Sequence, residues 1–115
     1  MEQLNRVELR GTVGTVKTQT LSGNKMTRFS LATSRAYKDK EGKAVIDTTW
    51  HSVVVWASDR IPDLDKIKIG SKVYASGRIQ TRKYTDNDNV ERTSYEVVAS
   101  KVTVIDNNET LDYEL

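Results

Sequence analysis

Residues 48–56, which read Thr-Thr-Trp-His-Ser-Val-Val-Val-Trp, constrain the fold more than any other stretch. They hold both tryptophans, the only histidine and five β-branched residues, a composition that favours a strand over a helix. Because side chains alternate between the two faces of a strand, Trp50 and Trp56 share one face. Val53 and Val55 lie on the other face and suit a core. The tryptophan face is either a surface on which unpaired bases stack or a second buried face.

Four other segments are expected to form strands: residues 7–16, 26–33, 73–80 and 95–105. Between the third and fourth strands the pattern predicts a short helix, with Ser58 as N-cap, Pro62 in the first turn and Gly70 at the end. The apolar residues of this helix lie on one side, and they are Ile61, Leu64 and Ile67.

This order predicts an all-β fold, namely a five-stranded Greek-key OB-fold barrel with one short helix between strands 3 and 4. A small antiparallel sandwich would produce the same order of elements. Gly11 and Gly14 inside the first strand indicate bulges or a close backbone approach. Residues 21–24 predict a turn, residues 35–47 a charged loop, and residues 83–92 a polar hairpin loop.

The charge distribution predicts a basic domain, residues 1–105, followed by a short acidic tail, residues 106–115. All 18 Lys and Arg residues lie in the first part, whereas the tail carries four acids and no base. Such a distribution suits a nucleic-acid binder whose tail repels nucleic acid, although an ordinary solvated surface would look similar. With no signal peptide and no apolar run of membrane-spanning length, we expect a soluble intracellular protein with no membrane partner.

No residue pattern indicates catalysis. The chain has no cysteine and one histidine, so we expect no disulfide, no metal site and no cofactor. His51 has no nucleophile pattern around it and is interpreted as a hydrogen-bonded strand residue. Asp86 and Asp88 lack the bidentate Glu of a calcium loop, so an Asx-rich turn is expected there. We therefore predict a protein that is not an enzyme.

Aromatic residues are interleaved with basic ones in two places. Tyr37 lies between Arg35 and Lys38, and Tyr84 follows Arg82 and Lys83. Basic side chains neutralise phosphates without reading sequence, and aromatic rings stack unpaired bases. Together with Trp50 and Trp56, these residues predict a surface for single-stranded nucleic acid. Stacking does not distinguish RNA from DNA, so that choice stays open.

The chain resembles bacterial single-stranded DNA-binding proteins of the homotetrameric OB-fold family. The matching stretches appear in family order, and they are residues 5–14, 31–34, 49–54, 70–74, 77–86 and 95–98. The resemblance implies sequence-tolerant binding and protection of single-stranded DNA in replication, recombination and repair, within the bacterial cytoplasm and associated with the nucleoid. It also implies a dimer of dimers and contacts with replication and repair proteins.

The resemblance assigns base stacking to four aromatic residues, Tyr37, Trp50, Trp56 and Tyr84. Tyr37 and Tyr84 occupy positions that often hold tryptophan, and Trp56 occupies one that often holds phenylalanine. Arg82 and Lys83 match basic residues along the DNA path, and Arg35 and Lys38 are added as neighbouring phosphate contacts. The resemblance implies subunit contacts at four further residues, Val7, Leu9, His51 and Tyr74.

Two features depart from the family pattern. Gly14 is followed by Thr15-Val16-Lys17 in place of an Asp-Pro-Glu-like segment, which leaves the path of the first loop open. The family's long linker and acidic tip ending in Pro-Phe do not follow residue 105. A tail-less version, a trimmed version and a short acidic substitute all remain open. The alternative function is an OB-fold interaction module of replication restart that binds nucleic acid weakly.

Overall fold

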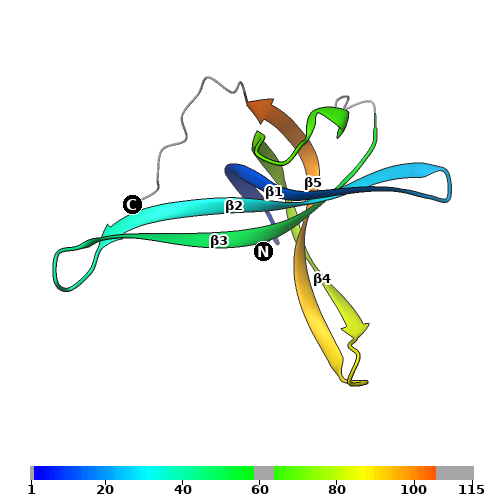
Figure 1. Ribbon diagram of the computed structural model, residues 1–115. Coiled ribbons are helices and arrows are strands. Elements are labelled where there is room, and N and C mark those ends of the chain that lie inside the picture. Colours follow the sequence, from blue (N-terminus) through cyan, green and yellow to red (C-terminus); the bar gives the residue numbers. More distant parts are fainter. Residues whose placement is uncertain (1, 59–63, 106–115) are drawn as a thin grey trace.

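The computed structural model describes residues 2–58 and 64–105, and its strands form one closed barrel (Figure 1). The elements in chain order are β1 (Val7–Leu21), β2 (Asn24–Lys38), β3 (Ala44–Trp56), η1 (Leu64–Lys66), β4 (Lys72–Thr85) and β5 (Glu91–Ile105). Neighbouring strands follow the order β1-β2-β3-β5-β4, and all pairs are antiparallel except β3 with β5. The predicted five-stranded barrel is therefore confirmed, and a sandwich is excluded.

The short helix predicted between β3 and β4 is reduced to a single turn in the described residues. They contain one 3-10 turn, Leu64–Lys66, whose end is marked by a 3.2 Å bond from the Ile67 N–H to the Leu64 carbonyl. Residues 59–63, which include Ile61 and Pro62, lie outside the described residues, and Ser58 forms an isolated β-bridge. Leu64 and Ile67 are nevertheless buried, at 5% and 4% exposure, so one short turn places both apolar side chains in the core.

Three strand pairs are longer than the sequence predicts: β1 and β2 stay paired as far as Leu21 with Asn24, and two further pairs each replace most of a predicted loop. β2 and β3 stay paired as far as Lys38 with Ala44, so the expected loop 35–47 is reduced to residues 39–43. β4 and β5 stay paired as far as Thr85 with Glu91, so the expected loop 83–92 is reduced to residues 86–90. The last two extensions project from the barrel as two arms (Figure 1). Their backbone ladders form without an apolar face, which is why no hydrophobic alternation marked them.

An aspartate closes the loop at the end of each arm. Asp39 Oδ1 accepts hydrogen bonds from the backbone N–H groups of Glu41 and Lys43, both at 2.9 Å. Asp86 Oδ1 likewise accepts bonds from Asp88 at 2.9 Å and Val90 at 3.0 Å. The predicted Asx-type turn is therefore confirmed at Asp86.

The glycines in the first strand mark the places where the barrel bends. The register between β1 and β2 shifts between Val13 and Thr15, so Gly14 lies in a bulge. β1 continues beyond it to a two-residue turn at Ser22 and Gly23, whose φ angles are 51° and 80°. Positive φ at both positions is typical of a type I′ hairpin turn, so the predicted turn is confirmed and the path after Gly14 is settled.

The core lies inside the barrel and is built from one face of each strand. Phe29, Leu31, Val53, Val55 and Val73 are at most 1% exposed, which confirms the face predicted from Val53 and Val55. The opposite face is not uniformly buried, because Trp50 and Trp56 are 61% and 41% exposed in this chain. The tryptophans are therefore not core packing residues. The predicted acidic tail, residues 106–115, lies outside the described residues.

His51 is hydrogen-bonded on β3, as expected. Its Nε2 lies 2.8 Å from the Thr33 hydroxyl on the neighbouring β2 strand. Partial burial disfavours the charged imidazolium and lowers the pKa of His51 below its usual value.

We expect Gly77→Ala to destabilise the fold. Gly77 lies beside the second bulge, between β4 and β5, and a Cβ there would sit 2.0 Å from the Val98 carbonyl oxygen. Because that atom belongs to the backbone, the strands must separate to admit a methyl group, at a cost of about 1–3 kcal/mol or more. Urea unfolding would measure the loss. Gly42→Ala is not a suitable control, because Gly42 has a positive φ of 81°, which strains an alanine. Ala44→Gly therefore provides the comparison.

We expect stability to decrease as the pH falls from about 7.5 to 5.5. The unfolded chain has the ordinary His pKa of about 6.5 and binds the proton more readily than folded His51 does. The stabilisation is therefore complete above the unfolded pKa and is lost as the pH falls through the lower folded value. Urea unfolding at fixed protein concentration would detect this, and His51→Gln should reduce the slope. An unchanged slope in the variant would contradict the assignment.

Candidate nucleic-acid interface

The outer face of the sheet, meaning the side turned away from the core, carries both tryptophans. Directly paired residues share a face, and Val54 on β3 pairs with Val98 on β5. By strand alternation this face continues from Trp50 and Trp56 on β3 to Arg82 and Tyr84 on β4. The structure therefore brings four of the eight predicted binding residues onto the same face of the sheet. Lys38, on the β2–β3 arm, also lies on this side.

The Trp50 ring packs against β1 at Gly14. A Cβ added to Gly14 would lie 2.4 Å from the Cζ3 atom of the indole, so the ring occupies the space that any other residue would fill. Beside it, the Ser30 hydroxyl accepts hydrogen bonds from the Thr15 N–H and the Thr15 hydroxyl, both at 2.9 Å. These contacts hold the bulge that supports the ring. The indole is thus supported on one side while 61% of the residue stays exposed.

An ion pair crosses the outer face between the two tryptophans. Arg28 on β2 pairs in register with Val54 and reaches over β3 to Glu96 on β5, with 3.4 Å between Nη2 and Oε2. Val54 lies on the same face and is only 3% exposed. The Glu96 side chain is 11% exposed, and Arg28 largely compensates its negative charge.

Three predicted residues lie on the opposite face. Tyr37 and Arg35 pair with Val45 and Asp47, which are in alternation with Val53, so they lie on the inner face of the β2–β3 arm. Lys83 lies on the inner face of the β4–β5 arm, in alternation with Ile79 and across from Thr93. The Arg35 guanidinium carbon is 5.0 Å from the centre of the Tyr37 ring. The sequence did not reveal this separation, because the resemblance matches positions and not faces.

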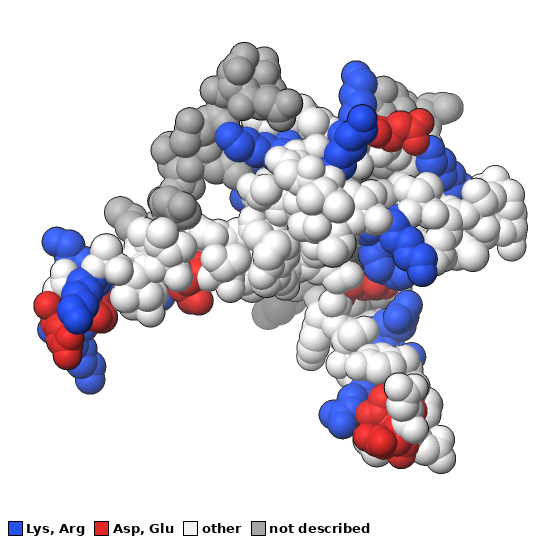
Figure 2. Space-filling model, viewed as in Figure 1, with Lys and Arg blue, Asp and Glu red and all other residues white. Residues whose placement is uncertain are grey.

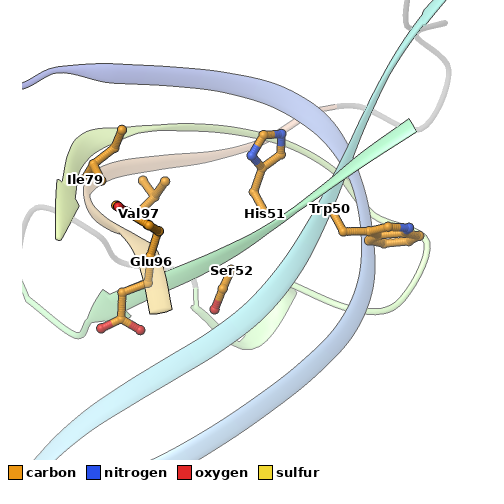
Figure 3. A pocket seen from close by; sticks show the side chains of 7 residues that line it. Trp50, His51, Ser52, Ile79, Glu96 and Val97 are labelled. Carbon is orange, nitrogen blue, oxygen red and sulfur yellow. The ribbon is translucent and has the colours of Figure 1, made fainter. Parts of the chain in front are cut away.

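A cleft opens where β3 and β5 separate. Their parallel pairing covers only Val53–Val55 with Val97–Ala99, and the two arms diverge before it (Figure 1). The cleft has a volume of about 230 Å³ and is lined by Trp50, His51, Ser52, Ile79, Tyr95, Glu96 and Val97. Figure 3 shows His51, Ile79 and Val97 on one side of the ribbons and Ser52 and Glu96 on the other. The cleft therefore connects the inner and outer faces.

Sequence reasoning missed Ile79 and Tyr95 as candidate site residues. They are 46% and 70% exposed, which is unusual for large apolar side chains inside strands. Both lie at the ends of segments predicted only as strands, residues 73–80 and 95–105, and no binding role was assigned to them. The missing information was where the core ends along β4 and β5. No local signal marks that point.

The basic side chains near this surface form few ion pairs with described residues. Lys38 and Arg82 form no ion pair with any described residue, and Lys83 is 3.8 Å from Glu91 with both side chains at least 70% exposed. Exposed pairs of this kind contribute about 0–1 kcal/mol, so a phosphate can replace the partner. Figure 2 shows mixed charges at the ends of the arms and a largely uncharged surface between them.

The residues predicted for subunit contacts lie mostly elsewhere. Val7 and Leu9 are partly buried against this chain's own core, and they pair with Gly77 and Ala75 of β4. β2 joins β1 only from Thr12 onward, so the other backbone edge of residues 7–11 has no strand partner among the described strands. Tyr74 lies between two cations, with Arg10 and Lys101 at 6.0 Å and 5.9 Å from its ring centre. His51 lines the cleft.

Within residues 2–58 and 64–105, no group of three His, Asp or Glu side chains is placed to hold a metal ion. In the same part of the chain, no helix is long and apolar enough to cross a membrane.

Comparisons with known proteins agree with this geometry. The Single-strand binding protein family model matches residues 4–105. A single-stranded DNA-binding protein of Neisseria meningitidis is 36% identical over 84 residues, which cover 73% of this chain and 48% of that protein. One from Rickettsia felis is 35% identical, covering 95% of this chain and 80% of the relative. The chain spans about half the length of the first of these relatives.

A solved structure of the Plasmodium falciparum SSB in complex with ssDNA superposes with a TM-score of 0.80. It is 29% identical in sequence and covers 92% of this chain and 98% of that one. The barrel and the sequence matches along it lead to one conclusion: the chain belongs to the single-strand binding protein family.

Proposed function

We propose that this protein binds single-stranded DNA with little sequence preference and protects it during replication, recombination and repair. The observation that carries the proposal is the pair of exposed indoles, Trp50 and Trp56, on one outer face of the barrel. In a duplex the flat faces of the bases are stacked on one another, so only an unpaired strand can offer them to these rings. Family membership and the likeness to an SSB complex with ssDNA support the same function.

Stacking and charge would act on different parts of the DNA. Each base stacked on an aromatic ring contributes about 1–3 kcal/mol by truncation, and every base has such a face. The exposed cations, Arg35, Lys38, Arg82 and Lys83, would neutralise phosphates, which makes the affinity fall as salt rises. The aromatic residues of this surface are Trp50, Trp56, Tyr84 and, on the inner face, Tyr37.

The protein would act by mass action and not by catalysis. Because it binds the open strand in preference to the duplex, its binding keeps complementary strands apart without any bond being made or broken. This role requires no metal and no cofactor. We place it in the bacterial cytoplasm at the nucleoid, where single strands form during replication, and where replication and repair proteins are its expected partners.

We also propose that the protein assembles as a homotetramer, a dimer of dimers. One backbone edge of residues 7–11 has no partner among the described strands, and this supports pairing between two β1 strands, since such an edge is a template for another chain. Tyr74, with Arg10 and Lys101 over its ring, is the predicted contact on the outer surface of β4. His51 is the other predicted contact.

Trp50→Ala should weaken binding of dye-labelled oligo(dT) by about 1–3 kcal/mol, because one stacking ring is lost. Fluorescence anisotropy would measure the affinity at several salt concentrations. Ile69→Ala is the matched control, since Ile69 is 75% exposed and lies outside the strands. This control should leave the affinity unchanged. If the unaltered protein binds oligo(dT) no better than duplex, the interaction-module function replaces the one proposed.

Sedimentation equilibrium of the full chain should give the mass of four copies. Tyr74→Ala should shift the distribution toward dimers at micromolar concentration, because it removes a predicted contact between dimers. Tyr84→Ala, on the β4–β5 arm, provides the comparison and should leave the mass unchanged. A monomeric mass for the unaltered protein would contradict the tetramer.

A further inference from the structure

We propose that Tyr95 and Ile79 form an additional base-binding site in the cleft between the two arms, occupied by one unpaired base of single-stranded DNA. The inference rests on the proposed function and extends it to residues that neither the family pattern nor the sequence assigned. Tyr95 is the most exposed aromatic residue within the described part of the chain, at 70% against 61% for Trp50.

The two side chains form one small apolar surface. Ile79 pairs with Val97 and Thr81 pairs with Tyr95, so Ile79 and Tyr95 are diagonal neighbours on the inner face of the β4–β5 arm. Diagonal neighbours across a strand pair are within reach of an aromatic side chain. Adjacent exposed apolar groups in a cleft commonly mark a binding site. A tyrosine ring beside an aliphatic branch offers a base both a stacking face and an apolar edge.

The cleft provides a path to this surface from Trp50. Trp50, Ser52 and Glu96 line its outer side, and His51, Ile79 and Tyr95 line its inner side. A single-stranded DNA molecule with one base stacked on Trp50 could therefore place a following base on Tyr95. This route would also explain how residues on opposite faces of the sheet, such as Trp50 and Lys83, could contact the same DNA molecule.

The base of the β4–β5 arm is held in place before any ligand binds. The Asn5 side chain donates from Nδ2 to the Ile79 carbonyl at 2.8 Å, and the Ile79 N–H donates to Asn5 Oδ1 at 2.9 Å. The β1–β4 backbone ladder ends at Val7 with Gly77. The two Asn5 hydrogen bonds extend it to Ile79, with the Asn5 side chain in place of a strand backbone. A surface already fixed in position loses less entropy when it binds.

The charges around the cleft suit a nucleotide. Lys83 is a diagonal neighbour of Tyr95 on the same inner face, and among the described residues its only ion pair is the exposed one with Glu91. Glu96 faces the cleft from the other side, but Arg28 already compensates it at 3.4 Å. One cation is therefore available for a phosphate next to the stacked base. Ser52 and His51, which also line the cleft, supply polar groups for the edge of the stacked base.

The test compares Tyr95→Ala and Tyr95→Phe with Trp50→Ala and the control Ile69→Ala, by anisotropy with oligo(dT). Tyr95→Ala should lower the affinity about 5- to 150-fold, and Tyr95→Phe, which keeps the ring, should change it by no more than about twofold. In the unaltered protein, an oligonucleotide with 5-iodouracil should photocrosslink to Tyr95, as mapped by mass spectrometry. This readout does not depend on whether a variant folds.

Full affinity in Tyr95→Ala, with a loss in Trp50→Ala, would overturn this site and leave the proposed function standing. No binding by the unaltered protein would overturn both. Sedimentation of Tyr95→Ala tests the other possible occupant of this surface, a second copy of the chain. A change in the number of copies would mean that a second chain covers Tyr95, and the inference would fail.

Discussion

The short parallel contact between β3 and β5 closes the barrel, and the rest of the structure depends on it. Only Val53–Val55 and Val97–Ala99 are paired, and five of these six residues are at most 6% exposed. Because the contact is short, the core is sealed while the strands on one side of it are free to diverge. The two arms, the cleft between them and the exposed face of Trp50 all follow from where this pairing ends.

Sequence reasoning predicted the barrel because its signals are local. The alternation around Val53 marks the core face, and the glycines at 14 and 23 mark a bulge and a turn with positive φ. The arms were not predicted, since residues such as Arg35 and Lys83 belong to strands with two solvated faces, and such strands carry no hydrophobic period. The helix was overestimated because Leu64 and Ile67 show helical spacing, yet one 3-10 turn is enough to bury both.

The sequence predicted which residues belong to the candidate site better than it predicted on which face of the sheet each one lies. Trp50, Trp56, Arg82 and Tyr84 share the outer face, but Tyr37, Arg35 and Lys83 lie on the inner one, which depends on long-range register. Tyr95 was overlooked because its exposure is set by the divergence of β3 and β5, a contact between segments about 40 residues apart. The support of the Trp50 ring by Gly14 likewise joins two distant strands.

The arms have a further consequence for motion. Their amides are bonded across a single strand pair in water, whereas the barrel amides lie over a packed core, so local opening of an arm requires far less free energy than opening the barrel. The molecule is thus divided into a rigid part, on which the Trp50 ring rests, and two compliant ribbons with Tyr37 and Tyr84 near their ends. A ligand of irregular shape, such as a flexible polymer, would find a fixed point of attachment flanked by surfaces that can adjust to it.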